Sequence, residues 1–178
     1  MTTLIVTSSA HGSTREIAER VAEVLRTSQA VPTVVEDVEG AAAWLATADA
    51  VIVAAPVYTG SFAADARAFL DTRRAELTDL PLVILASGGA PELARPVREK
   101  LESYGPREVA YFRGALFEER LGRLEKLKLK LSRNEHYGDF RDWDAIEAWA
   151  KTLPGAVSST KASAEAPPPP PSRRRQRR

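Results

Sequence analysis

The stretch that decides the fold runs from residue 4 to residue 14 and reads Leu4-Ile5-Val6-Thr7-Ser8-Ser9-Ala10-His11-Gly12-Ser13-Thr14. It opens with a short apolar run rich in β-branched side chains, which predicts a buried strand. Apolar residues then recur at Ile17, Val21, Val24 and Leu25, the spacing of one face of a helix. A strand, a loop that contains a glycine and an amphipathic helix therefore follow one another.

The same alternation continues along the chain. Further strands are predicted at residues 31–38, 50–55, 82–86 and 108–112, the second of these being ended by Pro56. Helices are predicted at residues 41–46, 63–76 and 93–104. Apolar strands that alternate with amphipathic helices are typical of a parallel sheet covered on both faces. We predict a three-layer α/β/α doubly wound fold with a five-stranded parallel sheet, in the order 2-1-3-4-5 or in the order of dinucleotide-binding sheets.

Ligands of such folds bind beyond the carboxyl ends of the strands, so the loops there are the candidate site. The first loop places the hydroxyls of Ser8, Ser9, Ser13 and Thr14 around Gly12, at the start of a helix. Free backbone N–H groups and the helix dipole favour an anion at such a place. We interpret the loop as a phosphate site. A capping box formed by Ser13 and Glu16 is the alternative, and it leaves several of the hydroxyls without a role.

Several classes of function are excluded by what the sequence lacks. It has no cysteine and two histidines, His11 and His136, which excludes thiolate metal sites, thiol nucleophiles and multi-histidine metal centres. It lacks the G-x-x-x-x-G-K-[ST] motif of P-loop enzymes. It also lacks the G-x-G-x-x-G motif of dinucleotide-binding folds, although Glu36 and Asp37 lie at the distance along the chain where those folds have a ribose-binding acid. The third strand ends without the acidic phosphoacceptor of a receiver domain.

Two further loops suit a flat ligand. Pro56-Val57-Tyr58-Thr59-Gly60 supplies an aromatic side chain that could stack on a ring, and Ser87-Gly88-Gly89-Ala90 is small enough for its backbone to lie close to one. Each stretch taken alone is also compatible with an ordinary turn. Their value lies in their common place, since both are predicted at the edge of the sheet that carries the first loop.

Together these loops resemble those of the flavodoxin-like family. Ser9-Ala10-His11-Gly12-Ser13-Thr14 corresponds to the family's T-x-T-G-x-T stretch, with departures at Ala10 and His11. The resemblance implies the strand order 2-1-3-4-5 and FMN as cofactor, with its phosphate in the first loop and its ring between the other two. The implied cofactor-binding residues are Ser8, Ser9, Ala10, His11, Gly12, Ser13, Thr14, Pro56, Val57, Tyr58, Thr59, Gly60, Ser87, Gly88, Gly89 and Ala90.

Other segments resemble one branch of that family, the menaquinone-dependent protoporphyrinogen dehydrogenases and their flavodoxin-domain relatives. Phe112-Arg113-Gly114-Ala115-Leu116 precedes a Leu/Lys-rich segment, and Asp139-Phe140-Arg141-Asp142-Trp143-Asp144 leads into a last helix. The resemblance implies an FMN-dependent oxidoreductase with a small-molecule reductant and a quinone-type acceptor, without a catalytic side chain or a metal. Loops poor in acids, with Arg113 nearby, favour two-electron chemistry. A one-electron carrier and a flavin-free interaction module are the alternatives.

The flavin domain is expected to span residues 1–154, with a basic insertion at about 115–137. Leucines at helical spacing predict a basic amphipathic helix over 118–131, which could meet a membrane or a redox partner, pack on the domain, or form a homodimer. Residues 155–178 combine a proline run with the cluster Arg173–Arg178, so we expect a disordered tail that contacts an anionic partner or only aids solubility. No apolar run long enough to span a bilayer and no basic leader are present, so we expect a cytoplasmic protein, with peripheral membrane contact through the basic helix as an option.

Overall fold

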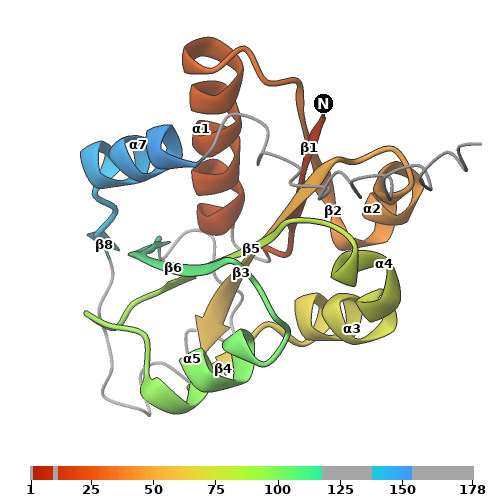
Figure 1. Cartoon of the computed structure of the whole chain (residues 1–178). Coiled ribbons are helices and arrows are strands. Elements are labelled where there is room, and N and C mark those ends of the chain that lie inside the picture. The colour runs from red at the N-terminus through yellow and green to blue at the C-terminus, as the bar shows by residue number, and fades with distance from the viewer. Residues whose placement is uncertain (1, 10–11, 118–137, 154–178) are drawn as a thin grey trace, which may run out of the picture.

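The computed structural model describes residues 2–9, 12–117 and 138–153, and the other residues are drawn in grey in Figure 1. The strands are β1 (Thr3–Thr7), β2 (Thr33–Asp37), β3 (Ala50–Tyr58), β4 (Ser61–Phe62), β5 (Leu82–Gly88), β6 (Glu108–Arg113), β7 (Ala115–Leu116) and β8 (Gly138–Asp139). The helices are α1 (Ser13–Ser28), α2 (Val38–Leu45), α3 (Ala64–Thr72), α4 (Arg74–Thr78), α5 (Arg95–Glu102) and α7 (Trp143–Thr152).

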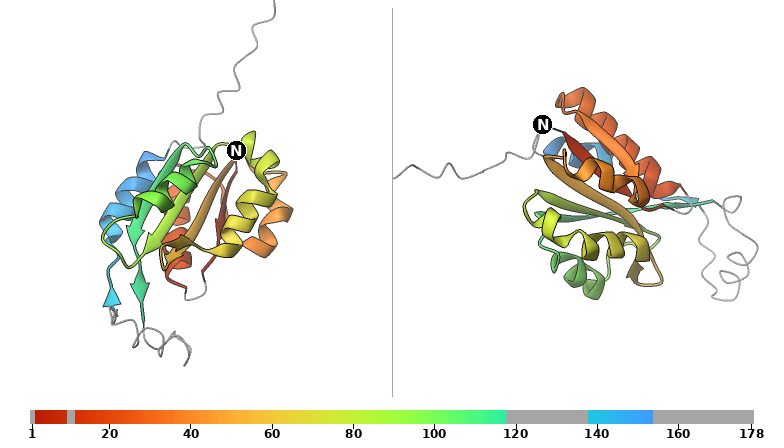
Figure 2. Two further views of the ribbon diagram at one scale, coloured as in Figure 1. Left: turned by 90° about the horizontal axis from the view of Figure 1, so that it is seen from below. Right: turned by 90° about the vertical axis from the view of Figure 1, so that its right-hand side faces the viewer.

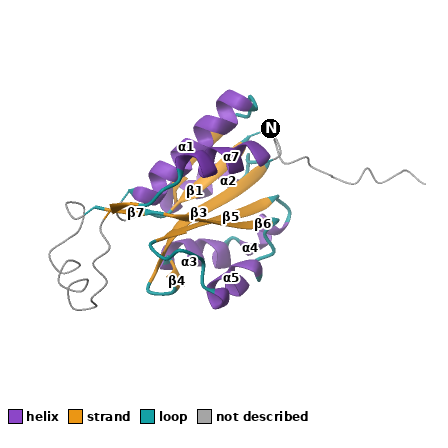
Figure 3. Cartoon of the chain, turned by 90° about the vertical axis from the view of Figure 1, so that its left-hand side faces the viewer, coloured by secondary structure: helices purple, strands orange, loops and turns teal. Residues whose placement is uncertain are grey.

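The main sheet has five parallel strands in the order β2-β1-β3-β5-β6, and β4 adds a sixth strand, antiparallel to β3. This is the order 2-1-3-4-5 of the principal strands, so the predicted fold class is confirmed. Helices cover both faces of the sheet (Figure 3). The core divides accordingly, because successive side chains of a strand point to opposite faces. Ile5 packs with residues of α1 and α7, whereas Leu4 and Val6 pack with residues of α2, α3, α4 and α5.

Pro56 does not end the third strand, and that expectation was wrong. The pairing of β1 with β3 ends at Thr7 and Ala54, whereas β3 goes on to pair with β5 and then turns back into β4. The missing N–H of Pro56 therefore falls beyond the β1 ladder. β5 likewise runs two residues past Ala86, so that Ser87 and Gly88 belong to the strand.

Two helical boundaries also differ from the predictions. α2 begins at Val38, the residue that was expected to end the second strand, because Asp37 stands as its N-cap in extended conformation. The single helix expected at 63–76 is two helices, α3 and α4, separated at Arg73. α5 carries Pro96 in its first turn, where a missing N–H costs no helical hydrogen bond.

The sequence did not reveal the small two-stranded ladder formed by β7 and β8. β7 pairs antiparallel with β8, Ala115 opposite Asp139 and Leu116 opposite Gly138. Figure 2 shows this pair projecting from the end of the main sheet beyond β6. The predicted basic helix 118–131 and the tail 155–178 lie outside the described residues. In the part of the chain that the structure describes, no helix combines the length and the apolar character needed to cross a bilayer.

Candidate functional site

The three predicted loops meet at one edge of the sheet. Pairing places Thr7 beside Ala54, Pro56 beside Ser87, and Gly88 beside Arg113, so the carboxyl ends of β1, β3, β5 and β6 lie in order along that edge. The edge is where doubly wound sheets bind their ligands.

The N-terminus of α1 lacks a side-chain cap within the described residues. Its N-cap is Gly12, which has a φ of 80°. The Gly12 carbonyl oxygen accepts the first hydrogen bond of the helix, from the Glu16 N–H. The capping-box interpretation is therefore wrong, since Ser13 lies inside the first turn. Positive φ explains the glycine. First-turn N–H groups without a capping side chain are suited to bind an anion.

The Ser13 hydroxyl is positioned by the backbone of β7. Its Oγ accepts a hydrogen bond of 2.8 Å from the Ala115 N–H. A hydroxyl that accepts still has its own proton to donate. A β-carbon added at Gly114 would lie 3.3 Å from the same Oγ, so the backbone of the β6–β7 connection is held close to the first loop.

Thr14 is turned away from solvent. Its hydroxyl lies 2.7 Å from that of Ser87, and both residues are 2% exposed. The pair joins the start of α1 to the end of β5. Thr14 and Ser87 therefore fix the distance between the first loop and the loop after β5. They do not present two free hydroxyls to a ligand.

Ser8 is bonded to an acid that the loop-by-loop interpretation missed. Its hydroxyl lies 2.7 Å from both carboxylate oxygens of Asp65, in the first turn of α3. With Ser9, Pro56 and Tyr58 these residues line a cleft of about 410 Å³. Asp37 and Glu39 line it too, so the cleft is richer in acids than its loops. In the sequence, Asp65 stood out only as a residue in the first turn of the helix predicted at 63–76.

The loop after β3 is a tight hairpin. Tyr58 pairs with Ser61 across Thr59 and Gly60, whose φ values are 47° and 75°. Two successive positive φ values are typical of the turns that match the twist of paired strands. Tyr58 is 43% exposed, so an aromatic side chain stands at the surface of this edge.

The loop after β5 is held by side chains of β6. The Tyr111 hydroxyl donates to the Ala90 carbonyl at 2.7 Å, and burial raises the pKa of this phenol. A β-carbon at Gly88 would lie 3.0 Å from that hydroxyl and 3.4 Å from the Val57 carbonyl oxygen. A side chain at position 88 would therefore be crowded by two neighbours, which favours a small residue at this point of the loop.

Arg113 lies at the same end of the sheet. Its guanidinium carbon is 4.2 Å from the centroid of the Phe140 ring, and Nη2 is 3.4 Å from the Gly89 carbonyl oxygen. Its Nε is buried without a hydrogen-bond partner. A cation therefore stands beside the loop after β5, whereas Asp65, Asp37 and Glu39 line the cleft that contains Ser8, Ser9 and Tyr58.

The sequence model of the flavodoxin domain family matches residues 4–142. The chain belongs to this family. Among curated proteins no sequence matches the chain.

Solved structures agree with the fold of the flavodoxin domain. A flavodoxin from the domain Archaea has 17% identity and a TM-score of 0.50, over 75% of this chain and 97% of that chain. An oxidoreductase from Corynebacterium diphtheriae has 20% identity and a TM-score of 0.51, over 88% and 94%. Rubredoxin oxygen:oxidoreductase from Desulfovibrio gigas has 15% identity and a TM-score of 0.60 over 91% of this chain, which spans 37% of that protein.

The predicted site residues of the flavodoxin domain have three kinds of placement. Ala10 and His11 lie outside the described residues. Ser8, Thr14, Pro56 and Ser87 are buried at the carboxyl edge, and Ser13 is buried there with its hydroxyl on Ala115. The residues that are exposed or partly exposed are Ser9, Gly12, Val57, Tyr58, Thr59, Gly60, Gly88, Gly89 and Ala90.

Proposed function

We propose that this flavodoxin domain binds FMN and is an oxidoreductase that passes two electrons from a small-molecule reductant to a quinone-type acceptor, like the protoporphyrinogen dehydrogenases it resembles. One observation carries the proposal: the uncapped N-terminus of α1 lies at the same sheet edge as an exposed aromatic hairpin and a glycine loop. These three features in this arrangement suit a ligand in which a phosphate and a flat ring are joined by a chain.

The residues present fit FMN, which when bound supplies the redox chemistry. Backbone N–H groups of Ser13 and Thr14 follow Gly12 in the first turn of α1, where an anion is stabilised by the helix dipole. The Ser13 hydroxyl keeps a proton to donate because the bond it makes to Ala115 is an accepted one. These neutral donors would hold the phosphate without a lysine.

The flat part of the ligand would lie between the two remaining loops. Tyr58 presents an exposed ring at the β3–β4 hairpin, and the backbone of Gly89 is open, with no atom near the place of a β-carbon. An offset-stacked aromatic pair contributes about 1 kcal/mol beyond the area that it buries. The hairpin and the Ser87–Ala90 loop would thus exclude water from the two sides of the ring.

Charge favours two-electron chemistry at the ring end of the cleft. Residues 56–60 and 87–90 contain no acid, and Arg113 stands beside Gly89. A nearby cation stabilises negative charge that develops on a reduced ring. Asp37 and Glu39 line the cleft that Tyr58 also lines, and Arg15, which pairs with Asp37 at 2.7 Å, offsets part of their negative charge.

The first experiment is to incubate the purified protein with FMN, desalt it and record the absorbance at about 450 nm, where oxidised flavin absorbs. We expect retained flavin, reduced by stepwise titration at one midpoint that corresponds to two electrons. Arg113→Gln is expected to lower that midpoint potential, with Arg95→Gln, on an exposed face of α5, as the matched control.

Two results would redirect the proposal. Two well-separated one-electron midpoints would favour the electron-carrier alternative, which the likeness to flavodoxins also supports. A folded protein that retains no FMN would favour a flavin-free interaction module. Contact with a membrane or an anionic partner through 118–131 and Arg173–Arg178, and a homodimer, stay predictions from the sequence.

A further inference from the structure

Asp65 is a carboxylate that faces the cleft without a cationic partner. Among the described residues no lysine or arginine forms an ion pair with it, whereas Asp37, which lines the same cleft, is paired with Arg15. Asp65 itself is exposed, and the buried Ser8 hydroxyl donates to it. The charge of Asp65 is therefore held in a fixed place and is open to whatever occupies the cleft.

The acceptor capacity of Asp65 is only partly used. A carboxylate offers about four lone-pair sites. The Ser8 hydroxyl shares its proton between Oδ1 and Oδ2, and Oδ1 also accepts the Ala66 N–H at 2.8 Å. At least one direction of Oδ2 remains for a donor from the cleft. A group that only accepts cannot bind a phosphate, but it can bind hydroxyls.

Asp65 lines the same cleft as Ser9 of the first loop and Tyr58 of the β3–β4 hairpin, which belong to the two ends of the proposed ligand site. The N-terminus of α1 follows Ser9 along the chain, and Tyr58 lies across the same cleft as Ser8, Ser9 and Pro56. In FMN the part between phosphate and ring is the ribityl chain, a polyol whose hydroxyls are donors. Resting on the proposed function, we infer that Asp65 accepts hydrogen bonds from the ribityl hydroxyls and makes the site selective for a polyol-bearing flavin.

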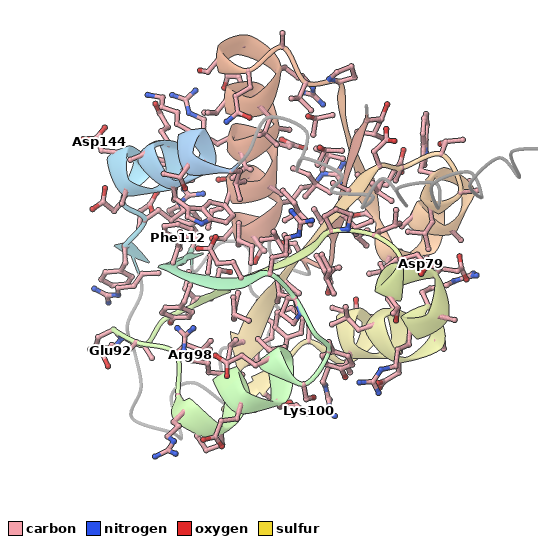
Figure 4. All side chains as sticks on the ribbon, in the orientation of Figure 1. Asp79, Glu92, Arg98, Lys100, Phe112 and Asp144 are labelled. Atoms are coloured by element: carbon pink, nitrogen blue, oxygen red, sulfur yellow. The ribbon has the colours of Figure 1, made fainter. Side chains whose placement is uncertain are left out.

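The test compares two ligands and four proteins. FMN is titrated against phosphopentyl flavin, which keeps the ring and the phosphate on a chain without hydroxyls, and the dissociation constant is followed by quenching of flavin fluorescence. The variants are Asp65→Ala, Ser8→Ala and the matched control Asp79→Asn. Asp79 is exposed at the end of α4, before the amino end of β5, and is labelled in Figure 4.

We expect Asp65→Ala to weaken FMN by about 10- to 100-fold, the range for a hydrogen bond to a charged group, and to leave phosphopentyl flavin within a factor of about 3. Ser8→Ala keeps the carboxylate and should keep the preference for FMN. Asp79→Asn should change neither constant. Where Asp65→Ala does not fold by circular dichroism, Asp65→Asn should show a smaller loss in the same direction.

Three results would overturn the inference. If Asp65→Ala weakens the binding of both flavins equally, Asp65 only orders Ser8. If Ser8→Ala loses the preference for FMN over phosphopentyl flavin as completely as Asp65→Ala does, the polyol contact belongs to Ser8. A gain in FMN affinity in Asp65→Ala would mean that the carboxylate repels the phosphate. In each case FMN still binds the wild-type protein and the proposed function stands. If the wild-type protein binds neither flavin, both fail.

Discussion

Arg141 is expected to be a main stabilising residue between the β7–β8 ladder and α1. Its side chain is 5% exposed, and it bonds to Glu16 in the first turn of α1 and to Asp139 in β8, at 2.8 Å from Nε and 2.5 Å from Nη2. The guanidinium carbon lies 4.6 Å from the centroid of the Trp143 ring. Arg141→Ala removes these contacts together.

The magnitude follows from the exposure of the partners. Breaking a fully buried pair costs about 3–5 kcal/mol, because it leaves a charge without water or partner. Here Glu16 and Asp139 are 37% and 38% exposed, so water replaces part of what they lose. Adding a cation–π contact of about 0.5–1 kcal/mol, we expect Arg141→Ala to reduce the free energy of unfolding by about 2 kcal/mol. That corresponds to a Tm about 4–8 °C lower.

The assay is urea denaturation followed by circular dichroism on Arg141→Ala, Arg141→Met and Glu16→Gln, with the double variant that closes the cycle. Arg141→Met keeps an apolar stem on Trp143 and should recover about 0.5 kcal/mol or more of the loss. The coupling between Arg141 and Glu16 should be about 0.5–1.5 kcal/mol. A loss below about 0.5 kcal/mol in Arg141→Ala, the range of ordinary surface substitutions, would refute the reasoning.

Three further predictions concern the site loops, each measured by denaturation. Gly88→Ala should destabilise by about 1–2 kcal/mol, because its β-carbon meets the Tyr111 hydroxyl at 3.0 Å, and the loss should be smaller in a Tyr111→Phe background. Burial raises the pKa of Tyr111, so its contribution should hold below pH 10 and fall as pH rises through the raised value, and Tyr111→Phe should flatten that fall. Thr14→Val leaves the Ser87 hydroxyl buried and unpaired, which should cost about 1–3 kcal/mol, part of it recovered by adding Ser87→Ala.

The fold could be predicted from the sequence because its strands are short continuous apolar runs. Leu4–Thr7 and 82–86 are buried on both faces, and such runs between amphipathic helices favour a parallel sheet. Periodicity alone left two strand orders open, since it does not specify which strands pair. The predicted ends of strands and helices were wrong where the local preference of a residue was overridden by its tertiary surroundings. Val38 is β-branched but stands in the first turn of a helix, and Pro56 lies within a strand.

The location of the site was predictable, but its internal contacts were not. Carboxyl ends of parallel strands share an edge, so the loops after Thr7, Ala55 and Ala86 had to meet. What each hydroxyl bonds to depends on residues far along the chain. Ser8 reaches Asp65 and Thr14 reaches Ser87, and a single sequence contains no signal of either contact.

These long-range contacts change what counts as part of the site. The three hydroxyls of Ser8, Ser13 and Thr14 are bonded to three different elements: α3, β7 and β5. A hydroxyl with a fixed partner keeps its orientation before a ligand arrives, so less conformational entropy is lost on binding. The first loop is thus preorganised by α3, β7 and β5, which lie far from it in the sequence. Substitutions that displace the β7 backbone at Ala115 from Ser13 should therefore alter ligand affinity as directly as substitutions within the loop.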